Sequence, residues 1–358
     1  MRRSYFIFPL VLSLCAIATS AQSEMLSSDT KMVLVKTITG TISPKSVRAS
    51  GTGLVSAHNM MYNHSVTIYN SRTFELVATV SDSVKLSKYG YSKYTSIYKG
   101  APVEGSYSPD GKFLYVTNYA MYGKGYNREG HDTCSPASHY DNSFLYRINL
   151  DSYAIDNIYP VGTVPKVVEV SPDNKYILVS NWCSYDLKVI SVESQKVVKT
   201  LKIGAYPRGI AVSNDSKTAY VAEMGGTRIH VINLDTFKQT YIPIGSNPRA
   251  IVLSPDNSKL YATLNASGKV MSWDLNSNKA GKAIKTGKTA RSLAISTDGS
   301  ALFVVNFESD TVSKVRASDM KIIQTIHVCN EPIGVTFDAP TSRTWVACYG
   351  GSIKVFDN

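Results

Sequence analysis

Cysteine is scarce in this 358-residue chain, and none of its five cysteines belongs to a C-x-x-C pair or a C-x-x-C-H sequence. Zinc ribbons and covalently attached c-type haem depend on such spacings, so neither is expected. A G-x-S-x-G stretch, which forms the nucleophile elbow of α/β-hydrolases, is also missing. Beyond the N-terminal segment, no run approaches the roughly 20 apolar residues of a membrane-spanning helix. We therefore expect no transmembrane segment and no cofactor.

The first residues predict export. Arg2 and Arg3 precede the apolar run YFIFPLVLSLCAIA, and small residues follow it before Gln22. This layout is typical of a secretory signal peptide, which we place at residues 1–21, with residues 22–358 as the mature protein. A lipoprotein anchored at Cys15 is the alternative, although Leu14 stands where a small residue is required. The sequence thus predicts a periplasmic, extracellular or cell-surface location.

Basic residues outnumber acidic ones, 38 to 27, which gives a formal net charge of +11. An excess of this size favours anionic partners without identifying one. The alternative is a basic exported protein whose charge has no specific partner.

One phrase recurs along most of the chain and predicts its architecture. The clearest copy is SPDGKFLYVTNY, and STDGSALFVVNF is a later one. The copies, the first and last of them degenerate, are anchored at Ser50, Ser108, Ser171, Ser213, Ser254, Ser296 and Asp338. The intervals are 58, 63, 42, 41, 42 and 42 residues. Each unit holds four short strands separated by Asn, Asp, Ser and Gly turns, which is typical of a propeller blade.

The two ends of the chain fit together into one blade. The last copy ends at GSIKVFDN, its third strand, while the N-terminal KMVLVKTITGTISP matches the fourth-strand phrase QKVVKTLKIGAYP. An N-terminal strand that completes the last blade closes the ring and removes a free edge. We therefore predict an all-β fold, a single seven-bladed β-propeller of four-stranded antiparallel blades.

The phrases PRGIAVSNDSKTAYVAE and SPDGKFLYVTNY resemble the YVTN-type β-propeller repeat family over nearly all of the mature chain. This resemblance implies an exported or surface propeller, similar to those of quinoprotein amine dehydrogenases, cytochrome nitrite reductases and nitrous oxide reductase. It is specific for fold and weak for function. The chain departs from the pattern at GTGLVSAHN in blade one and at TARSL, which lacks the usual proline, in blade six.

Two intervals are long because of insertions at about residues 80–100 and 120–142. Both belong to loop classes that share one face of a propeller, where binding residues concentrate. Their aromatic and basic residues are Tyr89, Tyr91, Tyr94, Tyr98, Tyr122, Tyr126, Tyr140, Lys85, Lys88, Lys93, Lys99, Lys124 and Arg128. Such a mixture suits single-stranded nucleic acid or an acidic glycan. The alternative is that the tyrosines pack the loops onto the propeller.

Cations also recur at the start of the innermost strands. The position after the turn proline, or its equivalent, is occupied by Lys45, Lys166, Arg208, Arg249 and Arg291. If they ring the mouth of the central channel, they form a funnel for carboxylates or phosphates. The alternative is structural pairing, in which Glu104, Glu169 and Glu223 neutralise them through salt bridges between blades.

Four cysteines remain after the signal peptide, and disulfides are expected in an oxidising compartment. Four cysteines allow three pairings. We expect Cys134–Cys183, which joins the second insertion to a loop of the next blade, and Cys329–Cys348, whose members lie in one blade. Histidine offers a weaker metal hypothesis through His58, His64, His131 and His139, whose spacing fits no tight metal motif.

Three functions therefore stay open. The favoured one is a monomeric binding protein that presents its basic, tyrosine-rich face to an anionic ligand or polymer, such as a small anion, an acidic glycan or nucleic acid. An enzyme, lactonase-like or redox, needs a convergent acid, base or metal cluster, for which Glu104, Glu169 and Glu223 are the candidate bases. The third is an interaction scaffold with a protein partner in the cell envelope. Fold alone does not decide among them.

Overall fold

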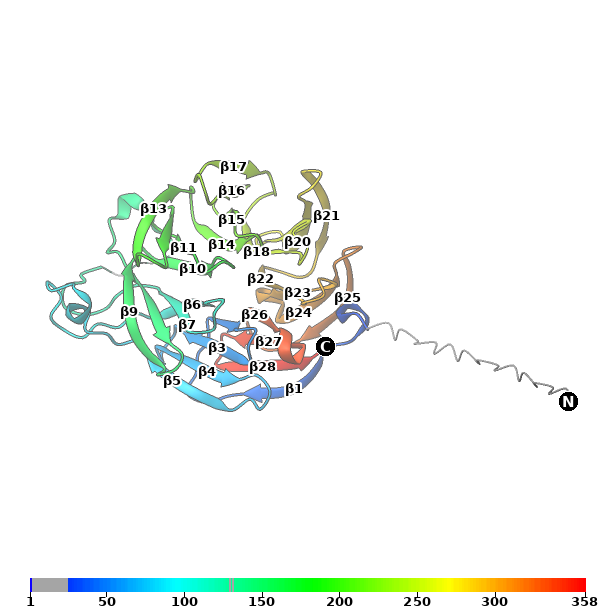
Figure 1. The fold of residues 1–358 in the computed structure, drawn as a ribbon, viewed down its shortest axis with the longest axis horizontal. Coiled ribbons are helices and arrows are strands. Elements are labelled where there is room, and N and C mark those ends of the chain that lie inside the picture. Colours follow the sequence, from blue (N-terminus) through cyan, green and yellow to red (C-terminus); the bar gives the residue numbers. More distant parts are fainter. Residues whose placement is uncertain (2–24, 129, 131) are drawn as a thin grey trace.

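Seven four-stranded antiparallel sheets surround a central channel in the computed structural model, which describes residue 1 and residues 25–128, 130 and 132–358 (Figure 1). This arrangement confirms the predicted seven-bladed β-propeller. Apart from residue 1, the expected signal peptide lies outside the described residues.

Blades one to six each run from an innermost to an outermost strand in chain order. Blades one to three comprise β2 (Ser46–Ala49), β3 (Leu54–Asn59), β4 (Ser65–Asn70), β5 (Leu76–Ser81); β6 (Pro102–Tyr107), β7 (Phe113–Asn118), β8 (Phe144–Asn149), β9 (Ala154–Pro160); and β10 (Pro165–Val170), β11 (Tyr176–Asn181), β12 (Asp186–Ser191), β13 (Lys196–Lys202). Blades four to six comprise β14 (Pro207–Val212), β15 (Thr218–Glu223), β16 (Ile229–Asn233), β17 (Gln239–Ile242); β18 (Pro248–Leu253), β19 (Lys259–Leu264), β20 (Lys269–Asp274), β21 (Lys279–Lys285); and β22 (Ala290–Ile295), β23 (Ala301–Asn306), β24 (Thr311–Arg316), β25 (Lys321–His327).

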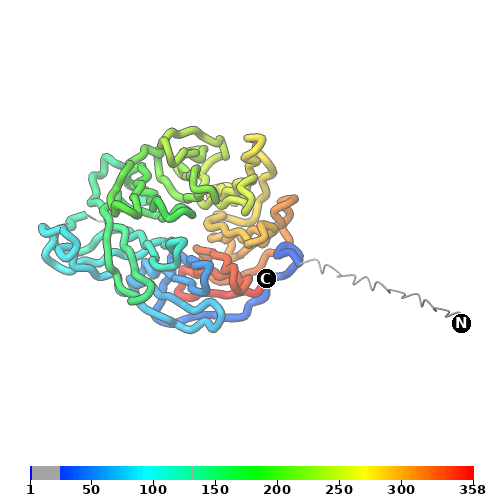
Figure 2. Tube along the Cα trace, in the orientation of Figure 1, coloured from blue at the N-terminus to red at the C-terminus, as the bar shows by residue number. Residues whose placement is uncertain are grey.

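Blade seven is built from both ends of the described chain, as predicted. It contains β26 (Pro332–Asp338), β27 (Arg343–Cys348), β28 (Ser352–Asp357) and, as its outermost strand, β1 (Val33–Ile38). The antiparallel pairing runs from Val33 opposite Asp357 to Ile38 opposite Ile353. Figure 2 shows the blue N-terminal segment beside the red C-terminal one. The pairing closes the ring, so that β28 has no free edge.

The recurring phrase is the turn between the first two strands of a blade. In the copy at Ser171, the serine hydroxyl donates to Asp173 Oδ1 at 2.6 Å and accepts the Tyr176 backbone N–H at 2.9 Å. Equivalent serine–aspartate bonds occur at Ser108, Ser213, Ser254 and Ser296. The side chains thus satisfy backbone groups that a tight turn leaves unpaired, which explains why this phrase repeats.

Apolar clusters lie between neighbouring blades. One joins Leu178 and Val189 of blade three to Ile210 and Val221 of blade four. Among the described residues, helical structure is limited to short 3₁₀ turns, which are η1 (Ser27–Asp29), η2 (Leu86–Tyr89), η3 (Pro136–Ser138), η4 (Phe307–Ser309) and η5 (Ala339–Thr341). In the described part of the chain, no helix has the length and apolar character needed to cross a membrane.

Candidate anion-binding site

A repeated backbone turn shapes one mouth of the channel. In six blades the residue before the innermost strand adopts a left-handed conformation with φ between 51° and 58°. These residues are Ala101, Val164, Tyr206, Asn247, Thr289 and Glu331. The carbonyl of each accepts a hydrogen bond, 2.9–3.1 Å long, from the backbone N–H of the residue that follows the second strand. Left-handed backbone is unusual for β-branched residues such as Val164 and Thr289, so the blade scaffold enforces the turn.

The residues that follow the second strands form what we call the rim. They are Met60, Tyr119, Trp182, Met224, Asn265, Phe307 and Tyr349. Four of the seven are aromatic. Trp182 is buried, and the other six rim residues are half-buried. Sequence reasoning missed the rim, although three of its members follow the repeated asparagine in VTNY, VSNW and VVNF.

Below the rim lie the five predicted cations, which we call the cation ring: Lys45, Lys166, Arg208, Arg249 and Arg291. The first four expose only 4–6% of their surface, and Arg291 is half-buried. They lie close enough to influence one another electrostatically: burial, and then the charges of Arg208, Arg291 and Arg249, hold the pKa of Lys45 well below its usual value. Arg208, Arg249 and Arg291 also line a channel cavity of about 450 Å³.

Lys166 is the ring member with the most partners. Its ammonium lies 2.8 Å from Asp132 Oδ1 and packs 4.5 Å from the centroid of the Tyr119 ring and 5.3 Å from that of Trp182. Burial lowers the pKa of Lys166 to about 8, although the Asp132 carboxylate opposes the shift. Asp132 comes from the second insertion and was not predicted. Its proximity in sequence to Cys134 was the available signal.

The other ring members differ in how their charge is balanced. Arg208 Nη2 lies 3.1 Å from Glu104 Oε1, which comes from a blade two positions away. Arg249 Nη1 donates to the Arg291 carbonyl at 2.8 Å, and the Arg291 guanidinium stacks 4.2 Å from the Phe307 ring centroid. Among the described residues, no carboxylate forms an ion pair with Lys45, Arg249 or Arg291.

Two of the three candidate carboxylates do not pair with the ring. Glu169 pairs with Arg48 at 2.5 Å, and both line the channel cavity. Glu223 ends β15 and pairs with Arg228 at 2.6 Å and with His230 at 3.2 Å, all in blade four. Of the predicted set, only Glu104 neutralises a ring cation.

The insertion tyrosines form an apolar cluster beside blade two. Tyr94 and Tyr126 stack at 4.8 Å, Tyr91 packs edge-on against Phe144 of β8, and the Tyr89 hydroxyl donates to the Ile155 carbonyl of β9. The two insertions also touch through a bridge between Lys99 and Tyr122. In Figure 1 these cyan loops project beyond the outer edge of the ring, away from the channel. These contacts agree with the alternative that the tyrosines pack the loops onto the propeller. Ligand binding by the predicted loop residues stays a prediction; they are Tyr89, Tyr91, Tyr94, Tyr122, Tyr126, Lys124 and Arg128.

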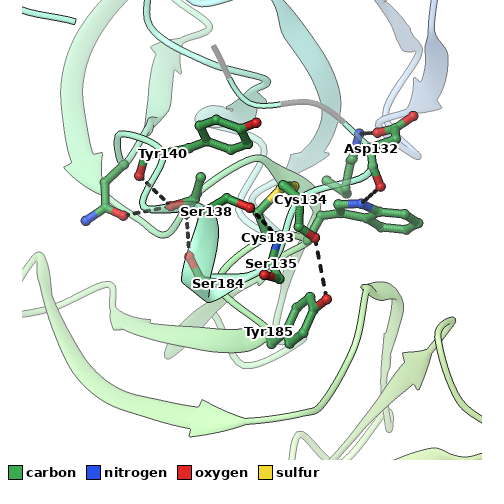
Figure 3. Close-up of a disulfide and its surroundings, with 12 residues drawn as sticks. Asp132, Cys134, Ser135, Ser138, Tyr140, Cys183, Ser184 and Tyr185 are labelled. Carbon is green, nitrogen blue, oxygen red and sulfur yellow. Dashed lines mark hydrogen bonds and ion pairs between the residues drawn. A yellow bond between two sulfur atoms is a disulfide. The ribbon is translucent and has the colours of Figure 1, made fainter. Parts of the chain in front are cut away.

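Both expected disulfides are present, with Cα–Cα distances of 5.3 Å for Cys134–Cys183 and 6.1 Å for Cys329–Cys348. The first is buried and fastens the second insertion to blade three (Figure 3). The Asp132 carbonyl accepts from Trp182 Nε1 at 3.1 Å, and the Cys134 carbonyl accepts from the Tyr185 hydroxyl at 3.4 Å. Together these contacts hold Asp132 over the cation ring.

The histidines do not form a metal cluster within the described residues. His58 is fully buried between Ser46 and Ser56, and burial lowers its pKa to about 3, so it is neutral. His64 lies 3.5 Å from Asp82, and His139 is exposed. His131 lies outside the described residues.

Comparisons with known proteins agree with the propeller repeat. A sequence profile of the YNCE-like beta-propeller family matches residues 131–218. Antigen Lp49 of Leptospira interrogans serogroup Icterohaemorrhagiae serovar copenhageni (strain Fiocruz L1-130) is 33% identical over 152 residues, which are 40% of this chain and 33% of that protein. The match thus spans about a third of that relative's length. A chain of Kuenenia stuttgartiensis hydrazine synthase superimposes with a TM-score of 0.68 at 16% identity, covering 90% of this chain and 97% of that one.

Proposed function

We propose that this β-propeller repeat protein is an exported binding protein that holds a small anionic ligand, or the anionic end of a larger one, in the cation ring. Catalysis is not part of the proposal. The observation that carries it is an imbalance of charge: five cations converge at the channel mouth, and two carboxylates, Glu104 and Asp132, pair with them.

Burial makes this imbalance costly. A charged side chain removed from water destabilises the folded protein unless an opposite charge or hydrogen bonds compensate it. Lys45 and Arg249 expose 6% of their surface each, and no described carboxylate pairs with them. A ligand that supplies the missing negative charge therefore stabilises the folded protein. Arginine provides paired N–H donors, which suit the oxygen atoms of an oxyanion.

The position of the ring favours a small anion over the backbone of a polymer. The cations lie behind the rim, and four of them are almost completely buried. Backbone phosphates of a nucleic acid or the carboxylates of a long glycan are contacted by exposed basic residues along a groove. The channel cavity lined by Arg208, Arg249 and Arg291 has a volume of about 450 Å³, which is enough for a compact anion or one terminal anionic group.

Export is supported by the two disulfides, which persist in oxidising compartments, together with the N-terminal sequence. The periplasm, the cell surface and the extracellular medium all provide such conditions. The ligand would therefore be met outside the cytoplasm.

Calorimetric titration of the mature chain tests the proposal. The probes are inorganic phosphate, succinate, single-stranded DNA and an acidic polysaccharide, each at several salt concentrations. One variant carries Lys45, Lys166, Arg208, Arg249 and Arg291 all changed to Ser. A control variant loses the same charge from exposed strand positions, with Lys196, Lys202, Lys279, Lys285 and Lys321 changed to Ser.

Saturable binding of a small anion by the wild-type and control proteins, and its loss in the ring variant, is the expected result. Circular dichroism establishes that both variants are folded. If both variants lose affinity equally, binding depends on the total positive charge of the protein, and the ring is not the site. Tighter binding of the polymers than of any small anion would overturn the size argument.

A further inference from the structure

We propose that the cation ring is divided in two and that its open half, formed by Lys45, Arg249 and Arg291, is a subsite for a compact dianion of the phosphate-monoester type. This inference rests on the proposed anion-binding function and names the chemistry of the ligand. The other half of the ring, formed by Lys166 and Arg208, already holds carboxylates of the protein itself.

The occupied half lies on blades three and four. Asp132 Oδ1 is 2.8 Å from Lys166 Nζ, and Glu104 Oε1 is 3.1 Å from Arg208 Nη2. Each of these two cations therefore has one carboxylate partner. A ligand that approached them would have to displace a protein group first.

The open half extends over blades five, six, seven and one. The Arg291 Nε atom is buried and has no hydrogen-bond partner among the described residues. Lys45 is 6% exposed, and no described residue forms a hydrogen bond or an ion pair with its ammonium. Glu331 at the start of blade seven is exposed and forms no ion pair with Arg249 or Arg291, although its charge and that of Asp132 raise the pKa of Arg291 against the effect of burial. Buried donors without partners are rare in folded proteins and call for an explanation, which a bound ligand supplies.

The charge of the open half selects the ligand. One carboxylate is satisfied by a single arginine through two parallel hydrogen bonds. Three convergent cations exceed that need, whereas a phosphate monoester at neutral pH carries up to two negative charges and several acceptor oxygens. A compact tetrahedral dianion therefore matches the open half better than one carboxylate does.

The rim beside the open half indicates what the dianion is attached to. The Phe307 ring stacks 4.2 Å from the Arg291 guanidinium, and Tyr349 packs 6.3 Å from Phe307. Both residues are half-buried, and Phe307 covers the guanidinium of Arg291, whose Nε atom has no hydrogen-bond partner among the described residues. An apolar or aromatic ester group would lie against these rings while its phosphate reaches the cations.

Calorimetry with inorganic phosphate and phenyl phosphate tests this assignment. The variants are Lys45→Met, Arg249→Gln and Arg291→Gln in the open half and the double variant Arg208→Gln/Glu104→Gln in the occupied half. The matched control is Arg316→Gln/Asp319→Asn, which removes an ion pair outside the ring. Each open-half variant should weaken binding of both probes at least tenfold and the occupied-half variant less than threefold, whereas the control should bind both probes as the wild-type protein does. Phe307→Leu should weaken phenyl phosphate several-fold and leave inorganic phosphate unchanged, which distinguishes an ester from free phosphate as the preferred ligand.

The results distinguish a failure of the dianion inference from a failure of the proposed anion-binding function. If succinate binds in a ring-dependent way and neither phosphate compound binds, the dianion inference is wrong while the anion-binding function stands. If the occupied-half variant loses as much affinity as the open-half variants, the division of the ring is wrong. If no anion binds the wild-type protein, both proposals fall.

Discussion

The carboxylate of Asp132 lies 2.8 Å from the ammonium of Lys166, so that an exposed loop residue balances a cation of which only 5% of the side chain is accessible. The loop is held in place by the adjacent Cys134–Cys183 disulfide and by the bond between Trp182 Nε1 and the Asp132 carbonyl. Asp132 thus occupies a position that the carboxylate of a ligand could take.

Replacement of Asp132 by Asn should increase the affinity for inorganic phosphate. The change removes a negative charge from beside the ring, but loss of Asp132 also lowers the pKa of Lys166, so the positive charge of the ring rises by at most one unit. A gain of about threefold corresponds to the modest value of a partly exposed ion pair. Asp235→Asn, in the exposed turn after β16, is the matched control and should change nothing. Weaker phosphate binding in Asp132→Asn would mean that the carboxylate helps to form the site.

Replacement of Lys45 by Met should stabilise the ligand-free protein and weaken anion binding. Burial and the charges of Arg208, Arg291 and Arg249 all disfavour the protonated amine and hold its pKa well below the usual value. An apolar side chain of similar length removes this cost, with an expected gain of about 1–3 kcal/mol in the free energy of unfolding. Urea unfolding measures it. A loss of stability would show that Lys45 is compensated in the ligand-free protein.

Affinity for phenyl phosphate, whose second ionisation lies at about pH 6, should fall as the pH rises from 7 to 9. Burial lowers the pKa of Lys166 to about 8, with Asp132 raising it and Arg208 and Arg249 lowering it further, so the ring loses one positive charge in this window. Ligand-free stability should change in the opposite direction. The pKa of Lys166 is about 8 in the folded protein and has the usual lysine value of 10.5 in the unfolded chain. Between these two pH values the unfolded chain binds more protons than the folded one, so the free energy of unfolding rises with pH.

The Lys166→Arg variant separates the contribution of Lys166 to these profiles. Arginine keeps its charge across the window, so the decline in anion affinity between pH 7 and 9 should flatten. An unchanged decline in this variant would assign the pH dependence to another group.

Loss of the Cys134–Cys183 disulfide should cost more stability than loss of Cys329–Cys348. The first closes a sequence separation of 49 residues and the second one of 19. Loop-closure entropy predicts losses of about 4 and about 3 kcal/mol for the paired Cys→Ser changes. Only the first change should also increase phosphate affinity, because it frees the segment that carries Asp132. Unfolding under non-reducing conditions and calorimetry on each double variant measure both effects.

The fold could be predicted from the sequence because the relevant interactions are local and repeated. The serine–aspartate turn at Ser171 and its equivalents uses residues two and five positions apart, so each copy is visible in the sequence. The closure of blade seven was also accessible, since β1 carries a fourth-strand pattern and β28 is a third strand.

The site was only partly accessible because its partners are distant in sequence. The ring cations share one position in the repeat and could be identified by alignment of the copies. Their partners come from elsewhere: Glu104 is 104 residues from Arg208, and Asp132 is 34 residues from Lys166. The insertion tyrosines looked like a binding platform, but whether aromatic side chains pack together or face solvent depends on the three-dimensional course of the loops.

The most direct measurement is anomalous diffraction from crystals of the mature protein grown with selenate, a tetrahedral dianion that contains a strong anomalous scatterer. The account predicts a selenium peak at the channel mouth, within hydrogen-bonding reach of the Lys45, Arg249 and Arg291 side chains. The same crystals of the Arg249→Gln/Arg291→Gln variant should lack that peak. An empty channel mouth in the wild-type protein at saturating selenate would contradict the assignment of the cation ring as an anion-binding site.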